Sequence, residues 1–79
     1  MEYIIALHIY NKNYQPLGRN GEVAKFGSLE EAVACIHDNN IPVEQNTVIL
    51  RIIGNFIADE YDAAQIKDLI AEKAVATAD

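Results

Sequence analysis

The chain has 79 residues, of which 51% are hydrophobic and 23% charged, and twelve acidic against six basic side chains give a net charge of −6. This composition is typical of one folded domain, residues 1–79, and argues against a disordered tail. A domain this short buries only about 60% of the surface of its unfolded chain, so its stability is marginal. The acidity disfavours direct binding to nucleic acid and favours a basic partner.

The sequence also indicates the compartment. A single cysteine, Cys35, excludes an internal disulfide, and the first residues lack the pattern of a secretory signal. The apolar runs are too short to cross a bilayer. We therefore expect a cytoplasmic protein without membrane contact.

The first predicted element is a strand at 3–10, where β-branched and aromatic residues follow one another without glycine or proline. Residues 11–21 contain the proline, glycines and asparagines that turns require, which predicts an exposed loop or hairpin tip. Residues 22–26 are then expected to return as a short strand.

A helix is predicted from the capping box formed by Ser28 and Glu31, in which the hydroxyl accepts the Glu31 amide and the carboxylate reaches back to the Ser28 amide. The helix ends near Asn39, because an asparagine pair followed by proline favours a left-handed stop. Its apolar stripe at helical spacing consists of Leu29, Ala32, Val33 and Ile36.

Residues 47–61 read as a β-hairpin turning at Gly54-Asn55. A two-residue turn there places Ile53 opposite Phe56 and Ile52 opposite Ile57. Directly opposite residues share a sheet face, so one face is expected to hold Ile49, Arg51, Ile53, Phe56 and Ala58, and the other Val48, Leu50, Ile52 and Ile57.

A second helix is predicted after the hairpin, with Asp62 and Gln65 as a second capping box. Its apolar stripe consists of Ile66, Leu69, Ile70 and Ala74. Asp68 and Glu72 lie four residues apart on the outer side, where they present negative charge to solvent.

Strand, strand and helix therefore occur twice in order. This order predicts an α+β fold, a two-layer sandwich in which a four-stranded, mainly antiparallel sheet carries two helices on one face (ββαββα). If residues 3, 5, 7 and 9 face the helices together with residues 48, 50 and 52, the opposite face is bare and strongly apolar, and such a face marks a protein interface. In the alternative, the loop at residues 11–21 or a short strand around residues 14–17 folds over this face and makes it ordinary core.

No catalytic motif is present, and we expect neither an enzyme nor a cofactor. Cys35 and His37 are two residues apart on a helix and point in different directions, so they do not form a metal site. The carboxylates of Asp59, Glu60 and Asp62 are explained by the start of the second helix, whose free amides they stabilise.

The sequence thus predicts a small acidic protein-binding domain that inhibits or regulates a partner by occupying its surface, with acidic helices standing where the phosphates of a nucleic acid would lie. In size and charge it resembles phage inhibitors of host defence nucleases, of the anti-CRISPR or anti-restriction kind, without a motif that defines a family. The expected partner-binding residues are Tyr10, Ile49, Arg51, Ile53, Phe56, Asp68 and Glu72.

Two other functions stay open at this stage. The bare sheet face would equally serve a homodimeric structural or regulatory module, such as an antitoxin or an accessory subunit. A cleft joining His8, Tyr10 and Arg51 would instead indicate a ligand-binding domain.

Overall fold

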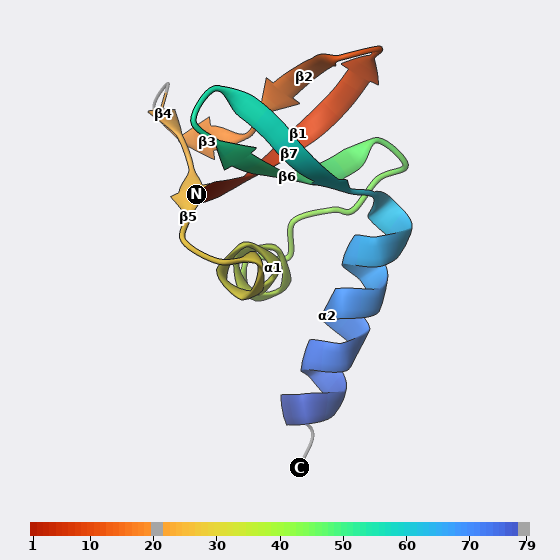
Figure 1. The fold of residues 1–79 in the computed structure, drawn as a ribbon. Helices are drawn as coiled ribbons and strands as arrows, with labels where there is room; N and C mark the ends of the chain where they lie inside the picture. Colours follow the sequence, from red (N-terminus) through yellow and green to blue (C-terminus); the bar gives the residue numbers. More distant parts are fainter. Residues whose placement is uncertain (20–21, 78–79) are drawn as a thin grey trace.

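The computed structural model describes residues 1–19 and 22–77 (Figure 1). Its elements are β1 (Glu2–Tyr10), β2 (Asn13–Pro16), β3 (Gly18–Arg19), β4 (Glu22–Val23), β5 (Lys25–Phe26), α1 (Leu29–Asp38), β6 (Thr47–Ile53), β7 (Phe56–Tyr61) and α2 (Ala63–Thr77). The predicted α+β class is confirmed, as are both helices and the hairpin.

The main sheet has the strand order β2-β1-β6-β7, and every pairing in it is antiparallel. β5 pairs with the start of β1 on the edge that β2 occupies farther along, and β3 and β4 form a separate two-stranded ladder. The segment predicted as a loop at 11–21 therefore contains strands. Residues 13–16 become β2 because β6 leaves the other edge of β1 open, and a strand edge within a sheet needs hydrogen-bonding partners.

Both helices lie on the same side of the main sheet, which confirms the two-layer arrangement (Figure 1). α1 runs beneath the sheet, whereas α2 leaves the end of β7 and points away from it. α2 consequently meets the core near its N-terminal end, where Ile66 is fully buried. The two helices splay apart and leave a hollow between them.

Both helices begin as the capping boxes predict. At α1, the Glu31 amide donates to Ser28 Oγ at 3.1 Å, but the Glu31 carboxylate accepts from the Gly27 amide at 3.0 Å and not from the Ser28 amide. At α2, the Gln65 amide donates to Asp62 Oδ1 and the Asp62 amide donates to Gln65 Oε1, both at 2.9 Å. The second box is fully reciprocal, and both helix starts are fixed locally.

The predicted sheet faces of β6 are wrong by one residue. β1 and β6 pair so that Ile5 lies opposite Ile49 and Ile4 opposite Leu50. Ile49 therefore shares the helix side with Ile5, while Leu50 lies on the face away from the helices. Because β6 is apolar at nearly every position, its alternation carries no signal, and a one-residue change in register exchanges the two faces.

The hairpin itself turns as predicted, with Ile53 opposite Phe56 and Ile52 opposite Ile57. A β-bulge then follows, and Arg51 lies opposite Asp59 where Ala58 was expected. The bulge inserts one extra residue into β7, which brings a carboxylate to the arginine.

Hydrophobic residues pack on both sides of the sheet. On the helix side the buried residues are Ile5, Ala32, Val33, Ile36, Ile49 and Ile66. On the other side Ala6, Val48 and Leu50 are buried, with Ile4, Tyr14 and Ile52 packed against them. The face predicted to be bare is thus partly core.

Tyr14 is the residue that covers this second face. It stands on β2, and its hydroxyl donates a hydrogen bond to the carboxylate of Glu60 on β7, so the contact joins the two edge strands of the four-strand path. The ring of His8 lies 5.0 Å from the ring of Tyr14. The face predicted to be bare is therefore covered in part by the side chain of Tyr14, whereas β2 itself extends the sheet at the edge of β1 and does not fold over the face.

Candidate partner-binding surfaces

The predicted partner-binding residues do not form one surface. Ile49 is fully buried on the helix side and is not accessible to a partner, which corrects its assignment. Arg51 lies opposite Tyr3. Tyr10 is seven residues farther along β1, about 23 Å away at 3.3 Å per residue. The cleft of His8, Tyr10 and Arg51 is excluded by the same separation, since Tyr10 and Arg51 lie toward opposite ends of the sheet.

Two of the predicted residues, Ile53 and Phe56, do lie together in an exposed position. They flank the turn of the hairpin, where Gly54 has a φ of +60°, as the first central residue of a type II′ turn requires. We call this surface the hairpin tip. Its members are Met1, Ile52, Ile53, Phe56 and Ile57.

Polar and ionic contacts lie around the base of the hairpin tip. Arg51 Nε and Nη2 both lie 2.5 Å from Asp59 Oδ2, and Arg51 Nη1 lies 3.3 Å from Met1 Sδ. Lys25 Nζ of β5 lies 3.7 Å from a carboxylate oxygen of Glu2. The acidic side chains beside the hairpin tip are thus each matched by a cation.

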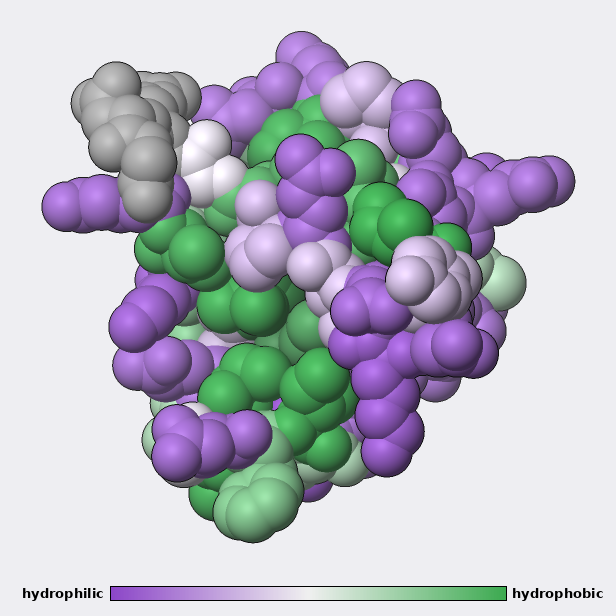
Figure 2. All heavy atoms as spheres, turned by 90° about the horizontal axis from the view of Figure 1, so that it is seen from above, coloured by the Kyte–Doolittle hydropathy of each residue, from purple (hydrophilic) through white to green (hydrophobic). Residues whose placement is uncertain are grey.

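The face away from the helices links this tip to the covered part of the sheet. Figure 2 looks down on that face and shows hydrophobic side chains through its middle, with hydrophilic side chains around them. Toward the hairpin, exposure on this face rises from 2% for Leu50 to 45% for Ile57. The apolar surface of this face is therefore covered in its middle and open to solvent at its hairpin end.

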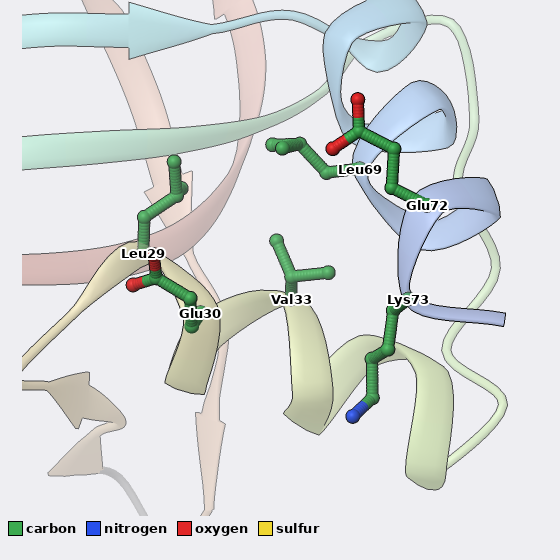
Figure 3. Close-up of a pocket in the computed structure, with 6 residues that line it drawn as sticks. All are labelled: Leu29, Glu30, Val33, Leu69, Glu72 and Lys73. Atoms are coloured by element: carbon green, nitrogen blue, oxygen red, sulfur yellow. The ribbon is translucent and has the colours of Figure 1, made fainter. Parts of the chain in front are cut away.

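A second surface lies between the helices, and we call it the interhelix groove. Leu29 and Val33 of α1 and Leu69 of α2 form its apolar floor, and Glu30, Glu72 and Lys73 stand at its rim, enclosing a cavity of about 290 Å³ (Figure 3). A neighbouring hollow shares Leu29 and Leu69 and is also lined by Tyr61, Gln65 and Asp68. Predicted residues Asp68 and Glu72 thus lie on one groove, on the same helix.

The groove carries net negative charge. Its two parts are lined by three carboxylates and one ammonium group, a net charge of −2. At the end of α1, a hydrogen bond with His37 at 3.0 Å and, to a lesser degree, the charge of Lys73 lower the pKa of Asp38 below its usual value of 3.8. Lys73 therefore acts electrostatically on α1 as well as on the groove.

Sequence reasoning missed the groove although it found most of its residues. Leu29 and Val33 were assigned to the core because they belong to the apolar stripe of α1, and Glu30 lies outside that stripe. The angle at which α2 leaves β7 is a tertiary feature, and it separates the two stripes enough to leave a hollow. The signal available in the sequence was Glu30, which directly follows Leu29 and so places a carboxylate next to the apolar stripe.

Other kinds of site find no support in the described part of the chain. No three His, Cys, Asp or Glu side chains in residues 1–19 and 22–77 lie close enough together to hold a metal ion. Within the same residues, no helix has the length and hydrophobicity needed to span a membrane.

Comparison of the chain with models of protein families, with curated proteins and with solved structures gave no significant match.

Proposed function

We propose that the protein is a non-catalytic binding domain whose interhelix groove docks a basic, amphipathic segment of a partner protein and so inhibits or regulates that partner. The observation that supports this best is the combination of an apolar floor with carboxylates on both helices. Glu30 stands on the α1 side and Glu72 on the α2 side, with Leu69 between them (Figure 3).

An amphipathic helix is the occupant that this shape and charge suit. Helices dock in apolar grooves through residues at i, i+3, i+4 and i+7, and flanking lysines or arginines pair with acids at the rim. Asp68 and Glu72 are separated by one turn of α2, about 6 Å along its axis, and line the groove one after the other. They are suited to bind successive cations of such a segment.

A basic nucleic-acid-binding protein is the class of partner that this surface favours. Such a protein displays cations where phosphates normally lie, and a domain of net charge −6 is attracted to that surface over distances of about a Debye length. Inhibition follows if the docked domain blocks the nucleic acid. A phage-type inhibitor of a defence nuclease acts in this way.

The test uses a synthetic helical peptide with leucines on one face and lysines on the other, labelled and titrated by fluorescence anisotropy. We expect the double variant Asp68→Lys/Glu72→Lys to bind about tenfold more weakly than the wild type at low salt, because two rim ion pairs become repulsive. The loss should shrink at 0.5 M salt, where charges are screened beyond a few Å.

The matched control is Glu22→Lys/Glu44→Lys, which changes net charge by the same amount at exposed positions outside the groove. This control should retain most of the affinity. Equal losses in both double variants would show that the peptide responds to total charge and would contradict docking in the groove. The two double variants can then be used as baits, and the proteins that each one captures from cells of the natural source can be compared.

A further inference from the structure

Most of the large apolar side chains that are exposed in the described part of the chain lie at the hairpin tip. Met1 is 69% exposed, Phe56 77% and Ile57 45%, and these side chains gather at one end of the sheet. Soluble monomers rarely leave so many large apolar side chains together in water. An aromatic residue surrounded by aliphatic ones is typical of the centre of a protein interface.

Neither layer of the fold covers this end of the hairpin. On β6, Ile49 is buried on the helix side and Leu50 beneath Tyr14 on the other, yet Ile53 is half exposed. The strand pairing assigns Ile53 and Phe56 to the helix side and Ile57 to the opposite face. Both faces of the tip are therefore apolar and uncovered by the described residues.

Charge determines which partner fits there. A chain of net charge −6 repels its own copies over most of its surface. At the hairpin tip that repulsion is reduced, because Glu2 is paired with Lys25 and Asp59 with Arg51. Two identical copies can therefore approach one another at this apolar tip with little electrostatic cost.

The backbone beside the tip is also suited to self-association. β7 is the last strand of the sheet, and no strand pairs with its outer edge among the residues that the structure describes. Its sequence lacks the lysine and proline that commonly protect such edges, and of its acids Asp59 is held by Arg51 and Glu60 by Tyr14. The start of β7, next to Phe56, therefore has backbone groups that remain open to a second copy.

We propose that two copies of this chain associate through the hairpin tip, with Phe56 of each copy packed against the apolar tip of the other. The dimer buries apolar surface that the fold leaves exposed and supports a domain whose small size limits its own core. The interhelix groove lies elsewhere on the chain, between α1 and α2, so this proposal does not depend on the proposed function.

Sedimentation velocity and light scattering over a range of protein concentrations test it. The wild type should have twice the monomer mass of 8.8 kDa at micromolar concentration. Phe56→Asp should raise the dissociation constant by at least about 100-fold, since a two-fold interface contains the substitution twice. Phe56 is mostly exposed in the monomer, and circular dichroism should show an unchanged fold.

Ile9→Asp is the matched control. Ile9 is 53% exposed near the other end of β1, so the substitution adds the same charge away from the hairpin tip, and the dimer should persist. Because the interface is apolar, its dissociation constant should change less than about threefold between 0.05 and 0.5 M salt. A wild type that stays monomeric, or a Phe56→Asp variant that stays as dimeric as Ile9→Asp, would overturn the proposal.

Discussion

Along β6, the residues at the base of the hairpin and those at its tip are the same kinds of amino acid in different surroundings. Val48, Ile49 and Leu50 lie between the helices on one side and Tyr14 on the other, and none is more than 3% exposed. Ile53, three residues later, is 47% exposed. Hydrophobicity thus indicates that a surface is buried, and the fold decides whether the chain itself or a partner buries it.

The sharpest test of this comparison replaces one isoleucine at the base and one at the tip. Ile49→Ala should lower the free energy of unfolding by about 2–5 kcal/mol, because it leaves a cavity among Ile5, Val33 and Ile66. Ile53→Ala should cost less than about 1 kcal/mol, because water already reaches that side chain.

Urea denaturation measures both values, at a concentration where the wild type is monomeric. The wild-type slope with urea should be retained in each variant, so that the midpoints can be compared directly. Similar losses at the two positions would mean that the tip is buried within the single chain, and the distinction between base and tip would fail.

The next largest effect on stability is expected at Tyr14, which covers the base of the hairpin on the face away from the helices. Tyr14→Phe keeps the ring over Ala6, Val48 and Leu50 but removes its hydrogen bond to Glu60. We expect a loss of about 1 kcal/mol in the free energy of unfolding, in the range for a hydrogen bond to a partly exposed carboxylate. A loss below 0.3 kcal/mol would show that packing of the ring alone covers this face.

The same contact predicts a dependence on pH. The hydrogen bond to Glu60, followed by burial and the charge of Glu60, raises the pKa of Tyr14 above its usual value of 10.0. A raised pKa stabilises the folded protein below pH 10, and this contribution disappears as pH rises through the folded-state pKa. The difference in stability between wild type and Tyr14→Phe should therefore narrow above pH 10, as measured by urea denaturation at each pH.

A smaller effect is expected at the turn. Gly54 has a φ of +60°, and an added Cβ would meet no atom within 4 Å. Gly54→Ala should therefore cost about 1 kcal/mol through backbone strain alone. Gly54→Asn should cost less, because asparagine tolerates positive φ better than alanine. Equal losses in the two variants, measured by thermal unfolding, would mean that the positive φ does not decide stability at this position.

The elements could be predicted from the sequence because their signals are local. Ser28 and Asp62 fix the helix starts with hydrogen bonds three residues away, and the pair Gly54-Asn55 fixes the turn. The face of β6 could not be predicted, because residues 48–50 are all apolar and the pairing with β1 decides their orientation.

The candidate surfaces were only partly predictable for a related reason. Ile53 and Phe56 were identified because they flank the turn, and Asp68 and Glu72 because they lie off the apolar stripe of α2. Ile49 was misplaced because the register of β6 was misplaced. The contact between Tyr14 and Glu60 joins residues 46 positions apart, and no local pattern indicates it.

The smallest effect on stability is expected for the double variant that weakens peptide binding at the groove. Asp68 and Glu72 are exposed like charges four residues apart on α2, and two lysines in their places repel one another about as strongly. Asp68→Lys/Glu72→Lys should therefore change the free energy of unfolding by less than about 0.5 kcal/mol. Urea denaturation of this variant at 0.05 and 0.5 M salt gives the value at both ionic strengths.

An unchanged stability of this variant would allow the groove and the hairpin tip to be distinguished, because binding at the groove is electrostatic and association at the hairpin tip is hydrophobic. Weakened peptide binding without a change in stability or in dimer mass would place electrostatic recognition in the groove, since the reversed charges lie away from Phe56 and the β7 edge. A loss of dimer in this variant would instead mean that α2 takes part in self-association. The two surfaces would then act as one, and salt would weaken both interactions together.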